Sequence, residues 1–163
     1  MKTLIVYSSQ TGNTKKLADA LAQMIAGEKT LRPISEAPDP AGYDLVALGF
    51  WLQAGKPDPK AAEYLAGIGD KKIFLFATHG AAADSAHARN AMEIAKSLAP
   101  SARIAGTFNC PGEVNSAHME KVRKKDPPPP WIDDAPAAVG HPDSGDIKRL
   151  AEEIRACLPG LIS

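Results

Sequence analysis

Thr3-Leu4-Ile5-Val6-Tyr7-Ser8-Ser9-Gln10-Thr11-Gly12-Asn13-Thr14 is the stretch of sequence that decides the fold of this chain. Residues 3–7 are apolar, β-branched or aromatic, which predicts a buried strand. Apolar residues recur at helical spacing over residues 15–27, which predicts a helix. Residues 8–14, here called the donor turn, therefore join the carboxyl end of a strand to the N-terminus of a helix.

The donor turn has the composition of an anion-binding site. Nearly all of its side chains are small hydroxyls, amides or glycine, and the following helix adds unpaired backbone N–H groups and the positive end of its dipole. No lysine or arginine lies within it, so neutral donors would hold the anion. This pattern suits a phosphate monoester and differs from the nucleotide P-loop, in which a lysine reaches the phosphates. A helix cap without a ligand is the alternative, but five consecutive capping-type residues exceed what a cap needs.

The rest of the chain alternates strands and helices, which indicates an α/β architecture. Continuous apolar runs at 44–50 and 72–77 are typical of strands covered on both faces. Strands are expected at 3–7, 29–34, 44–50, 72–77 and 103–108, and helices at 15–27, 57–66, 85–98 and 144–158. Five strands with intervening helices predict a three-layer, doubly wound sandwich with a parallel sheet of order 2-1-3-4-5.

Composition narrows the classes of protein to consider. The length of 163 residues fits one domain, and 44% hydrophobic with 23% charged residues is typical of a soluble globular protein. No apolar run approaches the roughly 18 residues of a membrane span, and the chain starts with a strand instead of a signal peptide. The two cysteines show neither metal spacing nor a disulfide framework, so a cytoplasmic location is expected. A formal net charge of zero gives no basic face for nucleic acid.

Residues 114–140 interrupt the alternation as a proline-rich insert within a single domain that spans residues 1–163. The insert contains four lysine and arginine residues, then Pro127 to Pro130 and Trp131. Four consecutive prolines cannot continue a helix or pair as a central strand, so an extended polyproline segment is expected. The insert is either a simple crossover before the last helix or a surface element that docks a partner or covers a ligand.

The sequence from Tyr7 to Thr14 resembles the phosphate loop of the flavodoxin family, in which a serine or threonine and then Thr-Gly-Asn-Thr wrap the phosphate of FMN. The resemblance implies a flavodoxin-like fold with FMN as cofactor, and no catalytic residue or metal site is expected. One property departs from the family. Flavodoxins are typically strongly acidic, whereas this chain is neutral, so a very low reduction potential and docking through one charged face are less expected here.

In open α/β sheets, ligands bind beyond the carboxyl ends of the strands, where the strand order reverses. The resemblance therefore implies cofactor contacts from the donor turn and from the segments after the third, fourth and fifth strands. The implied residues are Ser8, Ser9, Gln10, Thr11, Gly12, Asn13, Thr14, Phe50, Trp51, Leu52, Thr78, His79, Gly80 and Asn109.

Three of these residues carry specific expectations. Trp51 is similar in position to a tryptophan that flavodoxins place against the flavin ring, although Trp51 or Phe50 could instead pack on a helix, and the two could exchange roles. His79 either lies beside the ring, where its protonated form would stabilise the reduced flavin, or is a solvated surface histidine. Leu52 follows Trp51 where the family often has glycine, so stabilisation of the one-electron-reduced flavin should be weaker.

The leading hypothesis is an FMN-dependent electron transfer protein that shuttles electrons between redox enzymes. Its expected partners are a reductase and an acceptor protein, and the chain is expected to be a monomer or weak dimer. The alternative is an FMN-dependent oxidoreductase of the same fold that acts on a quinone, tetrapyrrole or other small acceptor. A docking module that lacks the cofactor is the third possibility, and the intact donor turn argues against it.

Overall fold

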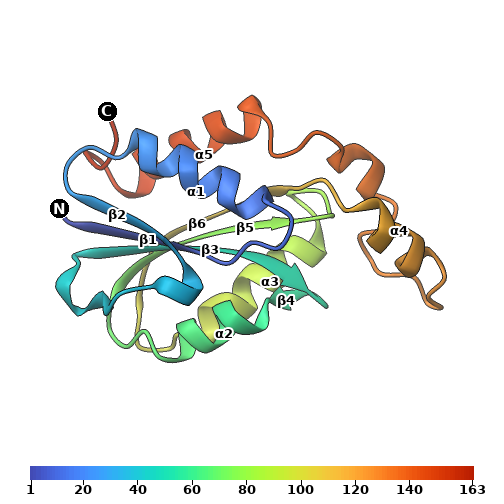
Figure 1. Cartoon of the computed structure of the whole chain (residues 1–163), viewed down its shortest axis with the longest axis horizontal. Helices are drawn as coiled ribbons and strands as arrows, with labels where there is room; N and C mark the ends of the chain where they lie inside the picture. The colour runs from blue at the N-terminus through green and yellow to red at the C-terminus, as the bar shows by residue number, and fades with distance from the viewer.

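A computed structural model describes residues 1–163 and contains a twisted parallel sheet with helices on both faces (Figure 1). Five parallel strands lie in the order β2-β1-β3-β5-β6. Their bounds are β1 Thr3–Tyr7, β2 Lys29–Pro33, β3 Leu45–Gln53, β5 Lys72–His79 and β6 Arg103–Pro111. Among the parallel strands this is the order 2-1-3-4-5 expected from the sequence.

Two helices cover each face of the sheet, which confirms the three-layer arrangement. α1 (Asn13–Met24) and α5 (Ser144–Cys157) pack on one face, and α2 (Pro59–Ala66) and α3 (Ala86–Ser97) on the other. The short 3-10 helices η1 (Ile34–Glu36) and η2 (Pro40–Gly42) connect β2 to β3. Leu45 to Phe50 of β3 are all buried because helices cover this central strand from both sides, as its continuous apolar run predicts.

The segment after β3 differs from the loop expected there. β3 continues to Gln53 and turns through Ala54 and Gly55 into β4 (Lys56–Pro57), which pairs with it in antiparallel direction. Both turn residues have positive φ, 51° at Ala54 and 74° at Gly55, as tight hairpins between twisted strands require. The helix expected from residue 57 begins at Pro59, because the Asp58 side chain caps it by accepting from the Ala61 N–H at 3.3 Å.

The insert is not the extended segment that the prolines predicted. It contains α4 (Ser116–Arg123), capped by Asn115, and the 3-10 helix η3 (Ala135–Ala138), and the proline run forms the connection between them. Met119, Val122 and Ala135 form a small core of its own. Residues 114–140 are called the cap from here on.

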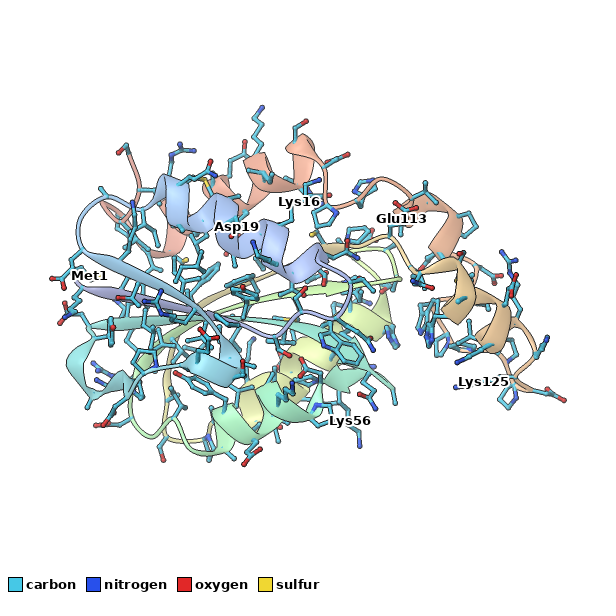
Figure 2. All side chains as sticks on the ribbon, viewed as in Figure 1. Met1, Lys16, Asp19, Lys56, Glu113 and Lys125 are labelled. Carbon is cyan, nitrogen blue, oxygen red and sulfur yellow. The ribbon has the colours of Figure 1, made fainter.

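The cap lies at the end of the molecule toward which the parallel strands point (Figure 1). Lys125 is at its far tip, and Met1 lies at the opposite end (Figure 2). None of the helices has both the length and the apolar character that a membrane span needs.

Candidate functional site

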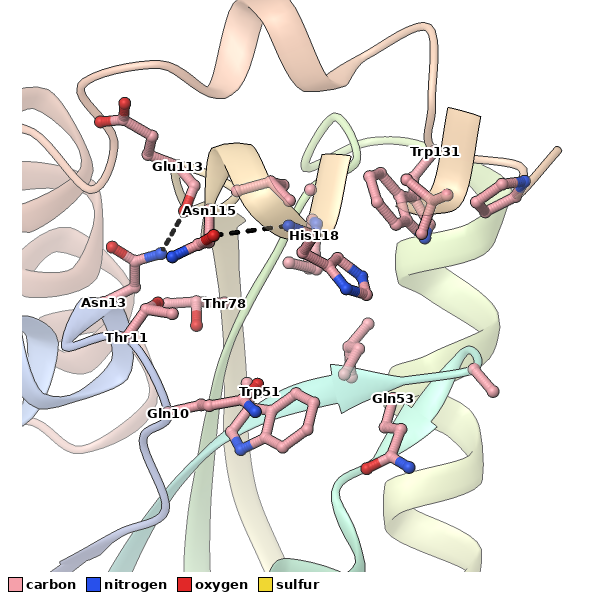
Figure 3. Close-up of a pocket in the computed structure, with 18 of the residues that line it drawn as sticks. Gln10, Thr11, Asn13, Trp51, Gln53, Thr78, Glu113, Asn115, His118 and Trp131 are labelled. Carbon is pink, nitrogen blue, oxygen red and sulfur yellow. Dashed lines mark hydrogen bonds between the residues drawn. The ribbon is translucent and has the colours of Figure 1, made fainter. Parts of the chain in front are cut away.

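A cavity of about 850 Å³ lies where the carboxyl ends of β3 and β5 meet the donor turn and the cap (Figure 3). Ten residues singled out from the sequence line it: Ser9, Gln10, Thr11, Asn13, Thr14, Trp51, Leu52, Thr78, His79 and Gly80. The structure therefore brings together the donor turn and the expected segments after the third and fourth strands. Four expected residues do not line the cavity: Ser8, Gly12, Phe50 and Asn109.

The N-terminus of α1 has no capping side chain, although it follows a turn full of capping residues. The other four α-helices are each capped, by Asp58, Ser85, Asn115 and Asp143. The first N–H groups of α1 have no intrahelical acceptor, and none of them donates to another part of the chain. These donors are available to an anion at the edge of the cavity, where the helix dipole also favours negative charge.

Two hydrogen bonds fix the donor turn to its surroundings. The hydroxyl groups of Thr14 and Thr78 lie 2.8 Å apart in a buried pair, which ties the turn to the end of β5. The Asn13 side-chain amide donates to the Glu113 carbonyl oxygen at 2.9 Å, which ties it to the base of the cap (Figure 3). Thr11 and Gln10 are exposed, and their side chains line the cavity without a hydrogen bond to the rest of the chain.

Ser8 and Gly12 stabilise the conformation of the donor turn. The Ser8 hydroxyl is buried and donates to Asp58 Oδ1 at 2.8 Å, and its N–H donates to the Gly49 carbonyl oxygen at 2.9 Å. Gly12 has φ 96°, a left-handed conformation that glycine adopts without strain, and its N–H donates to Ser9 Oγ at 3.1 Å. These contacts shape the turn, and neither Ser8 nor Gly12 lines the cavity.

Trp51 and Phe50 lie on opposite faces of β3, because successive side chains of a strand alternate. The Trp51 indole is partly exposed and lines the cavity, whereas Phe50 is fully buried in the core beneath α2 and α3. The two therefore do not exchange roles. Leu52 pairs with Pro57 in the hairpin, and the Asp58 N–H donates to the Trp51 carbonyl oxygen at 3.0 Å, so strand pairing holds the Trp51–Leu52 segment in place.

His79 is buried and held as a neutral ring. The Ala81 N–H donates to Nδ1 at 3.2 Å, so the proton is on Nε2, which donates to Asn109 Oδ1 at 2.8 Å. Burial lowers the pKa of His79 below 6.5, although the Asn109 and Ala81 contacts oppose that shift. His79 is thus neither a solvated surface histidine nor the protonated group considered from the sequence. Asn109 contacts its far side and fixes its orientation without reaching the cavity.

The cap supplies the part of the cavity that the sequence did not indicate. His118, Lys121, Lys125 and Trp131 all line the cavity. Figure 3 shows His118 and Trp131 across it from Trp51. The His118 and Trp131 rings are stacked, with centroids 6.0 Å apart and planes inclined by 15°. The sequence signal was present but weak: Asn115 is a capping residue, and Met119 and Val122 lie three apart on one helix face.

Close packing anchors the cap over the end of β5. A Cβ added to Gly80 would lie 2.8 Å from Val114 Cγ2 and 2.9 Å from Trp131 Cε3, so only glycine fits there. The Ala82 N–H donates to Asp134 Oδ2 at 3.0 Å. With the Asn13 contact at its base, the cap is tied both to the donor turn and to the segment after β5.

Comparison with known proteins agrees with this geometry. A sequence model of the flavodoxin domain matches residues 4–155. The chain is 35% identical over 129 residues to the flavodoxin-like domain-containing protein BilS of Clostridioides difficile (strain CD3), covering 76% of this chain and 73% of that protein. It is 26% identical over 184 residues to the BilS protein of Clostridium symbiosum (strain WAL-14163), covering 98% and 97%.

Solved structures share the fold at low sequence identity. A flavodoxin from the domain Archaea matches 85% of this chain and 99% of its own, with a TM-score of 0.57 and 16% identity. A flavoprotein from Lactobacillus acidophilus NCFM, solved in complex with FMN, matches 76% of this chain and 99% of its own, with a TM-score of 0.55 and 16% identity.

Proposed function

This chain belongs to the flavodoxin domain family, and on that premise we propose that it binds FMN in the cavity and transfers electrons with it. The observation that carries the proposal is the N-terminus of α1, which alone among the five α-helices has no capping side chain. A turn this rich in donors, left unpaired at a helix N-terminus, suits a doubly negative phosphate ester. FMN supplies the one- and two-electron chemistry, and the protein supplies binding, orientation and electrostatics.

The donor turn is proposed to hold the phosphate. The free N–H groups at the start of α1 and the side chains of Thr11 and Gln10 face this part of the cavity. No cation lies within the turn, and Lys15 and Lys16 point to other partners: Lys15 pairs with Asp19, and Lys16 donates to the Pro142 carbonyl oxygen. The phosphate would therefore be held by neutral donors and the helix dipole.

The segments after β3 and β5 are proposed to hold the flavin ring. Trp51 offers an aromatic face at one side, and Thr78, His79 and Gly80 border the other. Since His79 is neutral, it adds no positive charge beside the ring and does not favour an anionic reduced flavin. The strand-paired Leu52 agrees with the expectation of weak stabilisation of the one-electron-reduced form, which stays a prediction.

Electron exchange with a reductase and an acceptor protein is the proposed role. A second role, direct reduction of a small acceptor such as a quinone or tetrapyrrole, is favoured by one observation: the cap encloses space beside Trp51 that a small molecule can enter. A carrier should react slowly with NADH or NADPH alone and need a partner reductase. An oxidoreductase should turn over a small acceptor without a partner protein.

The experiment that tests FMN binding is a titration of purified apoprotein followed by anaerobic reduction with dithionite. We expect one FMN per chain and a reversible flavin spectrum. A protein that remains colourless and leaves the fluorescence of added FMN unchanged would refute the proposal.

A further inference from the structure

The net charge of the chain is zero, but its charges are not evenly distributed. Basic residues occupy nearly every position at the end of α4, and we call this group the basic tip. It consists of Lys121, Arg123, Lys124 and Lys125. All four are exposed, and Lys125 lies at the far end of the cap (Figure 2).

The basic tip has no acidic partner within the chain. On other helices, basic side chains pair with acidic ones three or four residues away, as Lys15 does with Asp19 on α1. No ion pair of the chain involves the basic tip, although Glu120 and Asp126 adjoin it in the sequence. Its positive charge is therefore free to meet another molecule.

The stability of α4 does not account for four adjacent cations. The helix dipole favours a cation in the last turn, which Lys121 and Arg123 already supply. Lys124 and Lys125 follow Lys121 by three and four positions, and like charges at that spacing repel each other on a helix. This concentration of charge is unfavourable for the chain alone, and a negatively charged partner would relieve it.

The basic tip borders the cavity. Lys121 and Lys125 line the cavity from the cap, and the exposed Gln53 and Ala54 line it from the hairpin. Lys56 is also exposed and is the strand partner of Gln53, so both side chains lie on the same face of the hairpin. Positive charge therefore lies on both sides of the place where the cavity reaches the surface.

We propose that the basic tip and Lys56 together dock an acidic surface of a redox partner protein beside the cavity. The inference rests on the proposed function, because docking here is useful only if the cavity holds the group that exchanges electrons. Glu113, the only acidic residue of the lining, is engaged elsewhere, since its Oε2 accepts from the Gly140 N–H at 3.2 Å. Attraction between opposite charges speeds association and orients the partner, and salt screens it.

The test measures electron transfer by stopped flow from the photochemically reduced, FMN-loaded protein to two haem proteins. Cytochrome b5 is acidic around its exposed haem edge, and cytochrome c is basic there. Each haem iron takes one electron, so one two-electron-reduced FMN reduces two cytochrome molecules and its protons are released to solvent. As ionic strength rises, we expect the second-order rate constant to fall for cytochrome b5 and to rise for cytochrome c.

Matched variants test the residues. Arg123→Gln with Lys124→Gln, the tip variant, removes two of the four charges, and neither residue lines the cavity. At low salt it should reduce cytochrome b5 roughly 2- to 30-fold more slowly, as expected for two exposed charge contacts, without slowing cytochrome c. Arg103→Gln with Arg155→Gln makes the same change in net charge at exposed positions, at the start of β6 and in the last turn of α5. This control should leave the ratio of the two rate constants unchanged.

FMN binding is measured first on every sample, so the two proposals fail separately. Loss of FMN binding in the native chain refutes the proposed function. If FMN binds but the rate with cytochrome b5 does not depend on salt, the docking proposal is refuted. It is equally refuted if the tip variant and the control react alike, or if the tip variant slows both cytochromes to the same extent.

An anionic lipid surface is the other large target for a basic segment, so phosphatidylserine vesicles are tested in parallel. We expect the tip variant and the control to bind the vesicles equally. Vesicle binding that only the tip variant loses, with an unchanged rate for cytochrome b5, would assign the basic tip to a membrane and overturn the docking proposal.

Discussion

Thr11→Val tests the proposed contact between the donor turn and the phosphate of FMN. Thr11 is exposed, lines the cavity and shares no hydrogen bond with the rest of the chain. Valine keeps the shape of the side chain and leaves no buried polar partner unpaired. The free energy of unfolding should therefore change by less than about 0.5 kcal/mol, as for other surface substitutions.

The expected loss of affinity follows from the charge of the ligand. A hydrogen bond to a charged group contributes about 1.5–3 kcal/mol, and about 1.4 kcal/mol corresponds to a tenfold change in Kd. Thr11→Val should therefore raise the Kd for FMN by roughly 10- to 150-fold. Riboflavin has no phosphate, so its Kd should not change.

The assay is quenching of flavin fluorescence, with FMN and riboflavin titrated in parallel. Thr107→Val is the matched control, because Thr107 lies on β6 and does not line the cavity. Equal losses for FMN and riboflavin, or an unchanged Kd for FMN, would show that Thr11 does not contact the phosphate.

Substitutions at three further residues test other contacts of the site. Trp51→Ala should weaken FMN and riboflavin alike, by roughly 2- to 10-fold for the aromatic contact, and a selective effect on FMN would contradict its place at the ring. Thr14→Val leaves the buried Thr78 hydroxyl without its partner, so urea unfolding should show a loss of about 1–3 kcal/mol, while Thr14→Ser should retain most of the stability. Because burial lowers the pKa of His79 in the folded state, the unfolded chain takes up its proton first as the pH falls below 6.5. Stability should then be full above pH 6.5 and decline below it, and His79→Gln should reduce that decline; an identical pH profile in the variant would refute the neutral assignment.

The fold could be predicted because its signals are local and repeated. The apolar runs of β3 and β5 are continuous, since helices cover both faces, and the donor turn marks where the first strand ends. Most element boundaries lie within two residues of the expected ones, and none differs by more than three. β3 and β6 each end three residues beyond the expected end. The extension of β3 into a hairpin depends on positive φ at Ala54, a residue type that gives no sequence signal for it.

The site was predictable to the extent that its residues lie next to strand ends. Trp51 and His79 are both at the carboxyl ends of strands and both line the cavity. Their environments were not predictable. Whether Phe50 or Trp51 faces the cavity depends on the pleat of β3. The neutral state of His79 depends on its burial in the folded chain, and its ring orientation depends on Asn109, thirty positions away in the sequence.

The conformation of the cap is where the prediction from the sequence was most clearly wrong. Four prolines suggested an extended segment, and the short helix before them has only Met119 and Val122 as buried residues. Its packing depends on contacts distant in sequence, notably the fit of Trp131 against Gly80. Such contacts leave no periodic pattern in a single sequence.

Parallel titration of native apoprotein with FMN and riboflavin probes the donor turn most directly. We expect one FMN per chain, with quenched fluorescence and an affinity at least tenfold above that for riboflavin, since only FMN brings a charged acceptor to the free N–H groups of α1. Equal affinities for the two flavins, or no binding of either, would contradict the account.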